Sequence, residues 1–251
     1  VLRSPGVPVP DTGFTFGLRH TRAVRRVLQS MDVVHIHHPF ISGQLALRYC
    51  RPHNIPLVFT NHSRYDLFAQ AYVPFLPGQV GTAVLQSYLP SLCQRVDLVI
   101  APSESLRAVL HDLGVACRME VIPNGVNLAP FQEQTRPASR VDLGVPDDVI
   151  LLIYVGRLAP EKNLPFLLKA FEGVQVAFPN TALALVGDGP ERDDLSRQVE
   201  KAGLPGKVRF VGLVEYSQVP KYLAMADVFV TASVAETFCL AAVEAMAVSL
   251  P

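Results

Sequence analysis

The sequence lacks several features that would assign it quickly to a common class. Its four cysteines are scattered and form no Cys-x-x-Cys pair, which argues against a disulfide framework or a zinc site and favours reduced, cytosolic thiols. Lys plus Arg and Asp plus Glu number 22 each, so no global charge points to a nucleic-acid partner. The Gly-x-Gly-x-x-Gly fingerprint of dinucleotide binding is also absent.

No signal peptide opens the chain, and residues 67–94 carry no charge. Such a stretch can indicate a membrane span, but Pro and Gly interrupt it repeatedly, which argues against a spanning helix. The chain begins at Val1 rather than Met and stops at Pro251 directly after a helical pattern, so we expect it to be a fragment. Its 251 residues suffice for one large domain or two ordinary ones.

Short β-rich runs alternate with helical patterns in both halves of the chain. Near-continuous apolar runs are typical of parallel strands buried on both faces, and strand–helix alternation indicates an α/β fold. The predicted strands are residues 32–37, 55–60, 97–102 and 119–123, then 149–156, 182–187, 208–212 and 227–233. The predicted helices are residues 18–31, 40–52, 80–95, 103–113, 164–178 and 190–203, with Asn163 as an N-cap before Pro165.

The composition changes between the two halves. Residues 124–147 are rich in Pro, Gly and polar residues, which is typical of a linker. We therefore predict an N-terminal Rossmann-like domain at 1–123, an interdomain linker at 124–147 and a C-terminal Rossmann-like domain at 148–251. Both domains are expected to be incomplete, with parallel sheets facing a cleft.

Polar and glycine residues follow the predicted strands, where open α/β sheets bind their ligands. Arg157 and Lys162 follow one strand and suit a diphosphate, because Arg binds oxygens as a fork and Lys acts as a point charge beside a helix N-terminus. Gly187 follows the next strand in a glycine turn. The pattern alone leaves open a solvated loop with ordinary surface charges and glycines that simply serve turns.

Two glutamates flank an apolar run near the end of the chain. Glu236 follows a strand, Thr237 can cap the next helix, and Glu244 lies about one turn into that helix. They are placed too far apart for an acid/base pair but suit two ends of an elongated ligand such as a nucleotide-sugar. The alternative is one capping Glu and one exposed helical Glu.

Histidines and arginines distinguish the first half. His35 and His37 share one strand face, but nothing nearby completes a metal site, so no metal is expected. His62 ends a strand, where it can orient a reacting hydroxyl or be an ordinary loop histidine. Residues 18–31 form a basic amphipathic pattern that suits anionic lipid or packing on its own domain. Its apolar side is Val24, Val27, Leu28 and Met31, and its basic side is Arg19, Arg22, Arg25 and Arg26.

Taken together, these segments resemble the retaining nucleotide-sugar glycosyltransferases of family 4, which have the GT-B fold. The matching pieces are "VIPNGVN", "GRLAPEKNLPFLLKAF", "LVGDGPERDDL", "FVG" and "ADVFVTASVAETFCLAAVEAMA", and in the first half "DVVHIHHPF", "IPLVFTNH" and "DLVIAPSE". Within the family the chain looks most like the bacterial diacylglycerol glucosyltransferases and related glycolipid mannosyltransferases.

The resemblance implies a role for each matching position. Arg157 and Lys162 would bind the donor diphosphate, Glu236 would contact the donor sugar, and Glu244 would hold the ribose hydroxyls. His62 would lie near the donor sugar, which makes His62, Arg157, Lys162 and Glu236 the expected catalytic set. The remaining donor-binding positions are Gly156, Gly187, Asp188, Phe238, Cys239 and Leu240. The family usually has Gly at Cys239 and commonly at Ser249.

The implied reaction moves a hexose from a donor of the UDP-glucose or GDP-mannose type to a hydroxyl, with retained configuration and no metal or other cofactor. The uncharged stretch 67–94 and the basic pattern at 18–31 favour a membrane lipid such as diacylglycerol as acceptor. We therefore expect a cytoplasmic protein that docks on the inner face of the plasma membrane. The aromatic and apolar residues that suggest this are Tyr72, Phe75, Leu76 and Tyr88. The alternatives are a soluble sugar acceptor, a non-catalytic nucleotide-binding fragment, or a related epimerase or phosphorylase.

Overall fold

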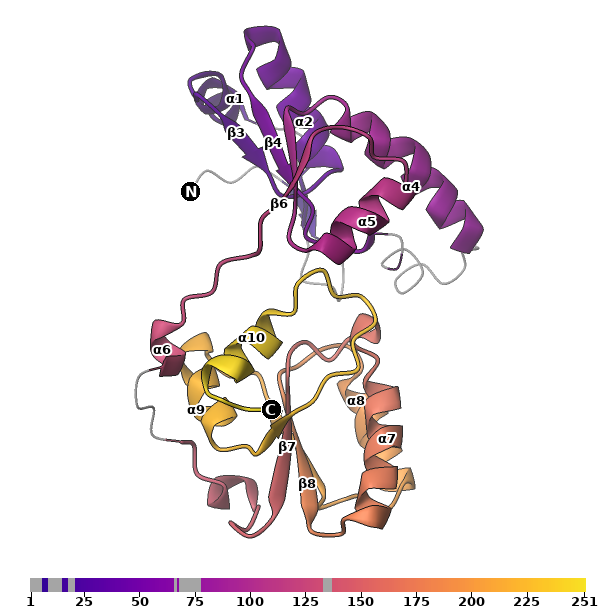
Figure 1. Cartoon of the computed structure of the whole chain (residues 1–251), viewed down its shortest axis with the longest axis vertical. Coiled ribbons are helices and arrows are strands. Elements are labelled where there is room, and N and C mark those ends of the chain that lie inside the picture. Colours follow the sequence, from indigo (N-terminus) through magenta and orange to yellow (C-terminus); the bar gives the residue numbers. More distant parts are fainter. Residues whose placement is uncertain (1–5, 9–14, 18–20, 66, 68–77, 133–136) are drawn as a thin grey trace. The chain divides into compact units, whose positions relative to one another are not determined.

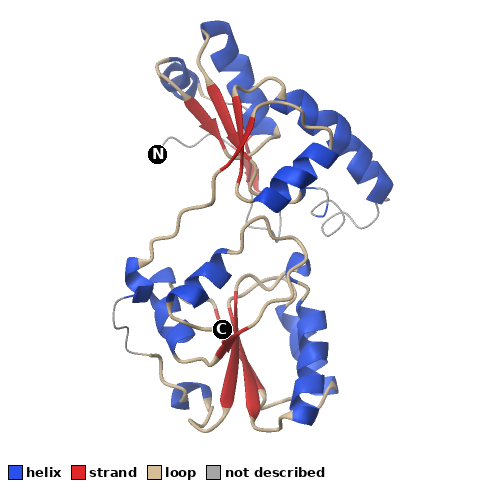
Figure 2. Ribbon diagram, viewed as in Figure 1, coloured by secondary structure: helices blue, strands red, loops and turns tan. Residues whose placement is uncertain are grey.

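The computed structural model describes residues 6–8, 15–17, 21–65, 67, 78–132 and 137–251. The chain divides into two compact units, Val1–Asn124 and Gly125–Pro251. Each unit contains a four-stranded sheet with helices packed against it (Figures 1 and 2). All neighbouring strands in these two sheets are parallel, so the predicted α/β class with two parallel sheets is confirmed.

The first unit has the strand order β3-β4-β5-β6. Its strands lie within the predicted ranges, and the antiparallel pair β1–β2 was not predicted. The strands are β1 (Gly6–Pro8), β2 (Thr15–Gly17), β3 (Val34–Ile36), β4 (Leu57–Thr60), β5 (Leu98–Ala101) and β6 (Met119–Val121). The helices are α1 (Arg22–Gln29), α2 (Ile41–Cys50), the 3-10 turn η1 (Arg51–His53), α4 (Gly78–Cys93) and α5 (Glu104–Asp112).

The core of this unit joins the middle strands to three helices. Leu57 and Phe59 on β4 are fully buried together with Leu47 on α2, and the same cluster takes in leucines of α4 and α5. Helix α1 differs from the others, because none of its residues is buried and only Leu28 packs against the core. The sequence therefore predicted the helix but not how loosely it is attached.

The second unit has the strand order β10-β7-β8-β9. The strands are β7 (Ile150–Val155), β8 (Thr181–Val186), β9 (Val208–Gly212) and β10 (Val228–Phe229). The helices are α6 (Ala129–Gln132), α7 (Leu164–Ala177), α8 (Arg192–Lys201), α9 (Val219–Ala224) and α10 (Leu240–Ala247), with 3-10 turns η2 (Val141–Leu143), η3 (Pro160–Lys162) and η4 (Tyr216–Gln218). Helix α9 was not predicted, and β10 is far shorter than the predicted strand 227–233.

Alternation along β8 separates two apolar layers in this unit. Leu183 and Leu185 face α7 and α8, whereas Ala182 and Ala184 face the side that carries α6, α9 and α10 (Figure 1). Successive side chains of a strand point to opposite faces, so a fully apolar strand fills both layers. This explains why β8 reads as an unbroken apolar run and is buried along its whole length.

Much of the predicted linker packs on the second unit. Phe131 on α6 and Val145 belong to its core, and the Arg140 guanidinium donates to the carbonyls of Val149 and Met225. The division between the compact units falls at Asn124 and Gly125, near the start of the predicted linker. The polar composition of the segment gave no sign of these apolar anchors.

One backbone device is repeated in both sheets. In the first unit the Asp97 carboxylate accepts the Leu57 N–H over 2.7 Å, while the Asp97 N–H donates to the Leu57 carbonyl over 2.8 Å. In the second unit Asp227 makes the same two bonds to Leu151, at 2.7 and 2.9 Å. Each Asp also pairs with an arginine, Arg51 or Arg140. In both sheets, the Asp immediately before one strand thus fixes the start of the neighbouring strand.

One detail at the start of α7 differs from the predictions. Asn163 does precede α7, but it has a left-handed conformation with φ of 52° and makes no side-chain capping bond. The short polar side chain of Asn tolerates this conformation, which turns the chain from η3 into α7. Pro165 lies in the first turn of α7, as predicted.

The predicted acceptor region is only partly described. Arg19, Tyr72, Phe75 and Leu76 lie outside the described residues. Tyr88 is half-buried, and its hydroxyl donates to the Pro39 carbonyl over 2.7 Å, so it serves the core of the first unit. Within the described ranges, no helix has both the length and the apolar character needed to cross a membrane.

Candidate functional site

The strand order of the second unit places a switch point between β7 and β10. After β7 the chain turns to α7 on one face of the sheet, and after β10 it turns to α10 on the other face. Ligands of open α/β sheets bind in the crevice that such diverging connections leave at the carboxyl ends of the strands. The segments that follow β7 and β10 at this edge, called here the crevice segments, are residues 156–163 and 230–239.

An ion pair joins these two segments. The Lys162 ammonium donates to Glu236 Oε1 over 2.6 Å, and both side chains are less than one-third exposed. Backbone bonds reinforce the pairing, because the Glu161 carbonyl accepts from the Val234 N–H at 3.1 Å and from the Ser233 hydroxyl at 3.2 Å. The structure therefore brings the predicted diphosphate-binding Lys and the predicted sugar-binding Glu into direct contact.

Arg157 follows β7 within the same crevice segment. Its carbonyl accepts a hydrogen bond of 2.9 Å from the hydroxyl of Tyr154, which is almost completely buried on β7. Burial, with Glu236 and Glu161 nearby, raises the pKa of Tyr154. The Tyr154 phenol therefore stays protonated and can donate to the Arg157 carbonyl. This hydrogen bond fixes the backbone at Arg157.

Glycines allow the loops after β7 and β8 to meet. Leu158 N–H donates to the Asp188 carbonyl at 3.0 Å, and Gly156 N–H donates to the Val186 carbonyl at 2.9 Å. A Cβ on Gly187 would lie 1.9 Å from the Gly156 oxygen, and a Cβ on Gly189 would lie 2.3 Å from the Leu158 oxygen. These glycines are required by close backbone approach and not merely by a turn.

Glu244 lies one turn into α10, as predicted, and its side chain is buried with 7% exposure. Tyr216 on η4 donates its hydroxyl to Glu244 Oε1 over 2.8 Å. Burial raises the pKa of Glu244, whereas the Tyr216 hydrogen bond opposes this effect. The predicted alternative of an exposed helical Glu is therefore wrong.

The start of α10 corrects one expectation. The helix begins at Leu240 with Cys239 as its N-cap residue, so Thr237 does not cap it. Thr237 is instead buried in the preceding loop. Cys239 has a φ of −75°, which any residue can adopt, so this backbone does not need the family's usual Gly here. Burial raises the pKa of the Cys239 thiol, which makes it a poor nucleophile.

His62 lies in the first unit, directly after β4. Its Nε2 and the Nδ1 of His37 form a hydrogen bond of 2.8 Å, and the rings stack with centroids 5.1 Å apart. His35 joins the same cluster through its ring contact with His37 and bonds Thr60 Oγ1 over 2.7 Å. Burial and then His37 lower the pKa of His62. In the part of the chain that the structure describes, no group of three or more His, Cys, Asp or Glu side chains suits a metal ion.

Several interacting residues were missed by the sequence reading. From the sequence, no positioning role was assigned to Tyr216, Tyr154 or His37. In the structure they bond Glu244, Arg157 and His62, respectively. No local pattern marks Tyr216, because Glu244 is 28 positions away. The "HIH" pattern did mark His37, but its pairing with His62 needs β3 and β4 side by side.

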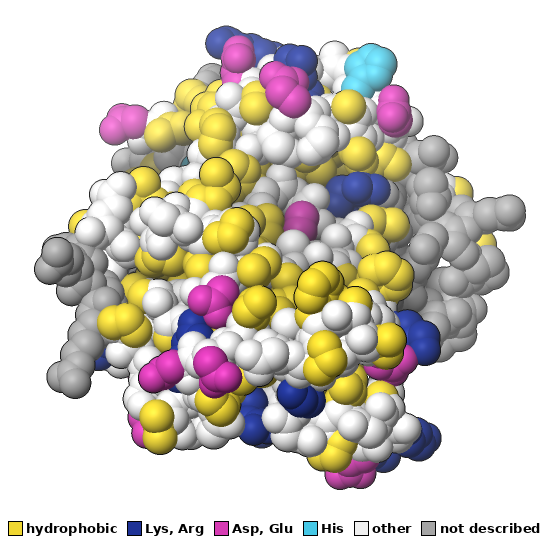
Figure 3. All heavy atoms as spheres, turned by 60° about the horizontal axis from the view of Figure 1, so that its bottom comes forward, with side chains coloured by type: hydrophobic (Ala, Val, Ile, Leu, Met, Phe, Trp, Pro, Cys, Tyr) yellow, Lys and Arg dark blue, Asp and Glu magenta, His cyan; other side chains and the backbone are white. Residues whose placement is uncertain are grey.

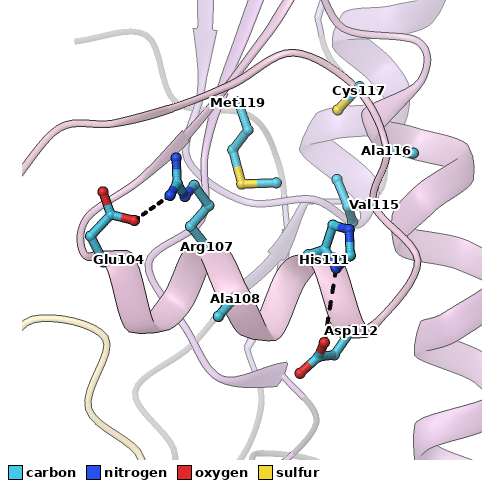
Figure 4. A pocket seen from close by; sticks show the side chains of 9 residues that line it. All are labelled: Glu104, Arg107, Ala108, His111, Asp112, Val115, Ala116, Cys117 and Met119. Atoms are coloured by element: carbon cyan, nitrogen blue, oxygen red, sulfur yellow. Dashed lines mark ion pairs between the residues drawn. The ribbon is translucent and has the colours of Figure 1, made fainter.

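Among the described residues, a cavity in the first unit is lined by none of the predicted site residues. A cavity of 640 Å³ lies beside α5 in the first unit (Figure 4), where Arg107 pairs with Glu104 over 2.7 Å and His111 lies near Asp112. Figure 3 shows apolar side chains interspersed with charged side chains of both signs on the face that it presents. The crevice at β7 and β10 therefore remains the best candidate site.

Family models match both halves of the chain. The family model Glycosyltransferase Family 4 matches residues 1–130, and Glycosyl transferases group 1 matches residues 135–251. The alpha-monoglucosyldiacylglycerol synthase of Acholeplasma laidlawii is 30% identical over 272 residues, which cover 100% of this chain and 66% of that protein. The chain thus spans slightly less than two thirds of this relative's length.

Solved structures match the fold. Sucrose-phosphate synthase from Thermosynechococcus elongatus gives a TM-score of 0.73 at 27% identity, covering 88% of this chain and 55% of that one. Anabaena HepE, in complex with UDP and glucose, gives a TM-score of 0.73 at 23% identity, covering 91% and 60%. These matches confirm the predicted GT-B class.

Proposed function

We propose that this chain, which belongs to glycosyltransferase family 4, transfers a hexose from a nucleoside-diphosphate sugar to a hydroxyl group with retained configuration. The observation that carries the proposal is the set of Lys162, Glu236 and Glu244 around the start of α10, at the switch point of the sheet. Two carboxylates and a cation in that crevice suit a ligand with sugar, phosphate and ribose parts.

The diphosphate would bind Arg157, Lys162 and the backbone N–H groups at Phe238, Cys239 and Leu240. Free N–H groups at a helix start attract anions. Lys162 would exchange its Glu236 partner for phosphate oxygens, which releases Glu236 to accept hydroxyls of the donor sugar. Stabilising the leaving diphosphate in this way is electrostatic catalysis, and with two cations at hand it needs no metal.

Glu244 would accept the two ribose hydroxyls, and His62 would lie near the reacting sugar. No carboxylate in the crevice is assigned as a nucleophile. The acceptor oxygen would form its bond to the anomeric carbon on the face from which the phosphate leaves. The acceptor proton would pass to an oxygen of the leaving phosphate, which balances the exchange and retains the configuration.

A membrane lipid such as diacylglycerol is the proposed acceptor. The relative named above is a glucosyldiacylglycerol synthase, and α1 supports docking on an anionic surface. Arg22, Arg25 and Arg26 are exposed on this helix, while Val27 is 41% exposed and Met31 beyond its end is 43% exposed. A basic helix that leaves apolar side chains in water can bind at a membrane interface.

A soluble sugar acceptor is the second candidate, favoured by the structural match to sucrose-phosphate synthase. Between the two donor classes, a uridine donor is favoured because HepE was solved with UDP and glucose. GDP-mannose is the competing donor type.

The test is a transfer assay on the folded chain with UDP-glucose and GDP-mannose, each offered to vesicles with diacylglycerol and to soluble sugars. Glucosylated diacylglycerol with an α-anomeric signal by NMR supports the proposal. Transfer only to soluble sugars selects the second candidate. Nucleotide binding by calorimetry without any transfer would identify a nucleotide-binding module instead.

A further inference from the structure

The buried carboxylate of Glu244 is held by a side chain to which no role has been assigned. Tyr216 follows β9 on the 3-10 turn η4, and its hydroxyl donates to Glu244 Oε1 over 2.8 Å. Tyr216 as a whole is nevertheless 58% exposed, so a residue at the surface holds a buried carboxylate. An exposed tyrosine that serves only packing has no need of such a bond.

A second contact orients the Tyr216 ring. The buried ring of Phe131 meets it edge to face, with centroids 6.2 Å apart and planes at 66°. Phe131 lies on α6, which packs against α10. Aromatic pairs prefer this arrangement, so the phenol is held in one direction by a fixed neighbour.

We propose that Tyr216 is a positioning residue that presents the Glu244 carboxylate to the ribose of the donor nucleotide. The inference rests on the proposed function of Glu244. A carboxylate has about four acceptor positions, so one bond to Tyr216 leaves room for two ribose hydroxyls. A single fixed orientation of the carboxylate reduces the ordering that binding would otherwise require.

The same bond favours the charged form of the carboxylate. Burial raises the pKa of Glu244, and the Tyr216 hydroxyl lowers it. The pKa of Cys239, just before α10, is raised by burial and, to a smaller extent, by the Glu244 charge. Helix α6, which also packs against α10, has no titratable side chain. Loss of the Tyr216 hydroxyl therefore raises the pKa of Glu244 further, and acid would weaken nucleotide binding at a higher pH.

The experiment measures calorimetric binding of UDP and 2′-deoxy-UDP to the parent chain and to Tyr216→Phe, between pH 5 and pH 8. The ratio of the two affinities reports the ribose hydroxyl bonds. We expect Tyr216→Phe to bind UDP about tenfold more weakly, which corresponds to loss of about one hydrogen bond to a charged group. The preference for UDP over its deoxy form should fall, and the acid midpoint of binding should move upward.

Tyr222→Phe is the matched control, because Tyr222 on the neighbouring α9 packs against the core of the same unit. A Tyr216→Phe chain with the parent's UDP preference and acid midpoint overturns the inference while leaving the donor site in place. A parent chain that binds neither nucleotide, or binds both alike, overturns the assignment of the ribose to Glu244 and this inference with it.

Discussion

Lys162 and Glu236 are 74 positions apart in the chain, yet their charged atoms meet at 2.6 Å across the switch point of the second sheet. The resemblance implied that these two side chains bind different parts of one ligand. In the structure the two charges neutralise each other. The ion pair thus joins the segments that follow β7 and β10.

Glu236→Gln should separate binding from transfer. Without the carboxylate, Lys162 is no longer neutralised, so we expect UDP to bind equally well or up to about fivefold more tightly, in line with a partly exposed ion pair. Transfer should fall by about a hundredfold, because a contact to the reacting sugar is lost. Calorimetry and initial rates measure the two effects. Glu172→Gln is the control, since Glu172 pairs with Lys169 on the outside of α7.

Glu244→Ala should weaken nucleotide binding by about 1.5–3 kcal/mol, because hydrogen bonds from the ribose to a charged group are lost. Binding of UDP by calorimetry checks this value. Glu200→Ala on the exposed side of α8 serves as the control. If Glu244→Ala binds UDP as tightly as the parent chain does, Glu244 does not hold the ribose.

Gly187→Ala should disrupt the packing between the loops after β7 and β8. The new Cβ would lie 1.9 Å from the Gly156 oxygen, so the loops after β7 and β8 must separate, and the φ of 132° adds strain. We expect a loss of about 3 kcal/mol or more in the free energy of unfolding. Gly173→Ala in α7 meets nothing within 4 Å and should instead stabilise by about 0.5–1 kcal/mol. Urea unfolding of both variants gives the comparison, and equal stabilities would contradict the close approach.

Ser249→Gly should stabilise the second unit. Ser249 has a φ of 63° just after α10, where the N–H groups of Ser249 and Leu250 donate to the carbonyls of Met246 and Ala245. This arrangement ends many helices and favours Gly, because a side chain is strained in the left-handed region. We expect a gain of about 0.5–1 kcal/mol in thermal or urea unfolding. Ser196→Gly inside α8 should have the opposite sign.

Acid should destabilise the first unit through its histidines. Burial lowers the pKa of His35, His38 and His62, so the unfolded chain binds more protons than the folded chain just below pH 6.5. The stability that the neutral rings contribute is complete above pH 6.5 and is lost as the pH falls from 6.5 through the lowered pKa values of the folded chain.

His62→Gln should therefore reduce the slope of unfolding free energy against pH between 7 and 5. The difference between variant and parent reports His62 together with its effect on the pKa of His35, because the buried carboxyls Glu191 and Glu244, whose pKa values are raised, titrate in both proteins. His111→Gln on the surface of α5 is the control. An unchanged slope in His62→Gln would show that the His37–His62 pair does not favour the neutral state.

The sequence by itself determined the alternation of strands and helices, the two parallel sheets and the positions of most site residues at strand ends. These follow from local patterns, since a strand buried on both faces must be apolar throughout and parallel strands end at one edge. The spacing of Glu236 and Glu244 also indicated an elongated ligand. Strand order, by contrast, cannot be predicted from any local sequence pattern.

Only the tertiary structure decided which of these residues meet. Because β10 lies beside β7, Lys162 contacts Glu236, and because α6 and η4 gather beside α10, Phe131 orients Tyr216 against Glu244. The same holds for Asp227 at Leu151 and His37 at His62. Each of these pairs joins segments that are distant in the chain and are brought together by burial of apolar surface. The hydrophobic effect that drives this burial is non-directional. Sequence spacing alone therefore cannot specify the partner.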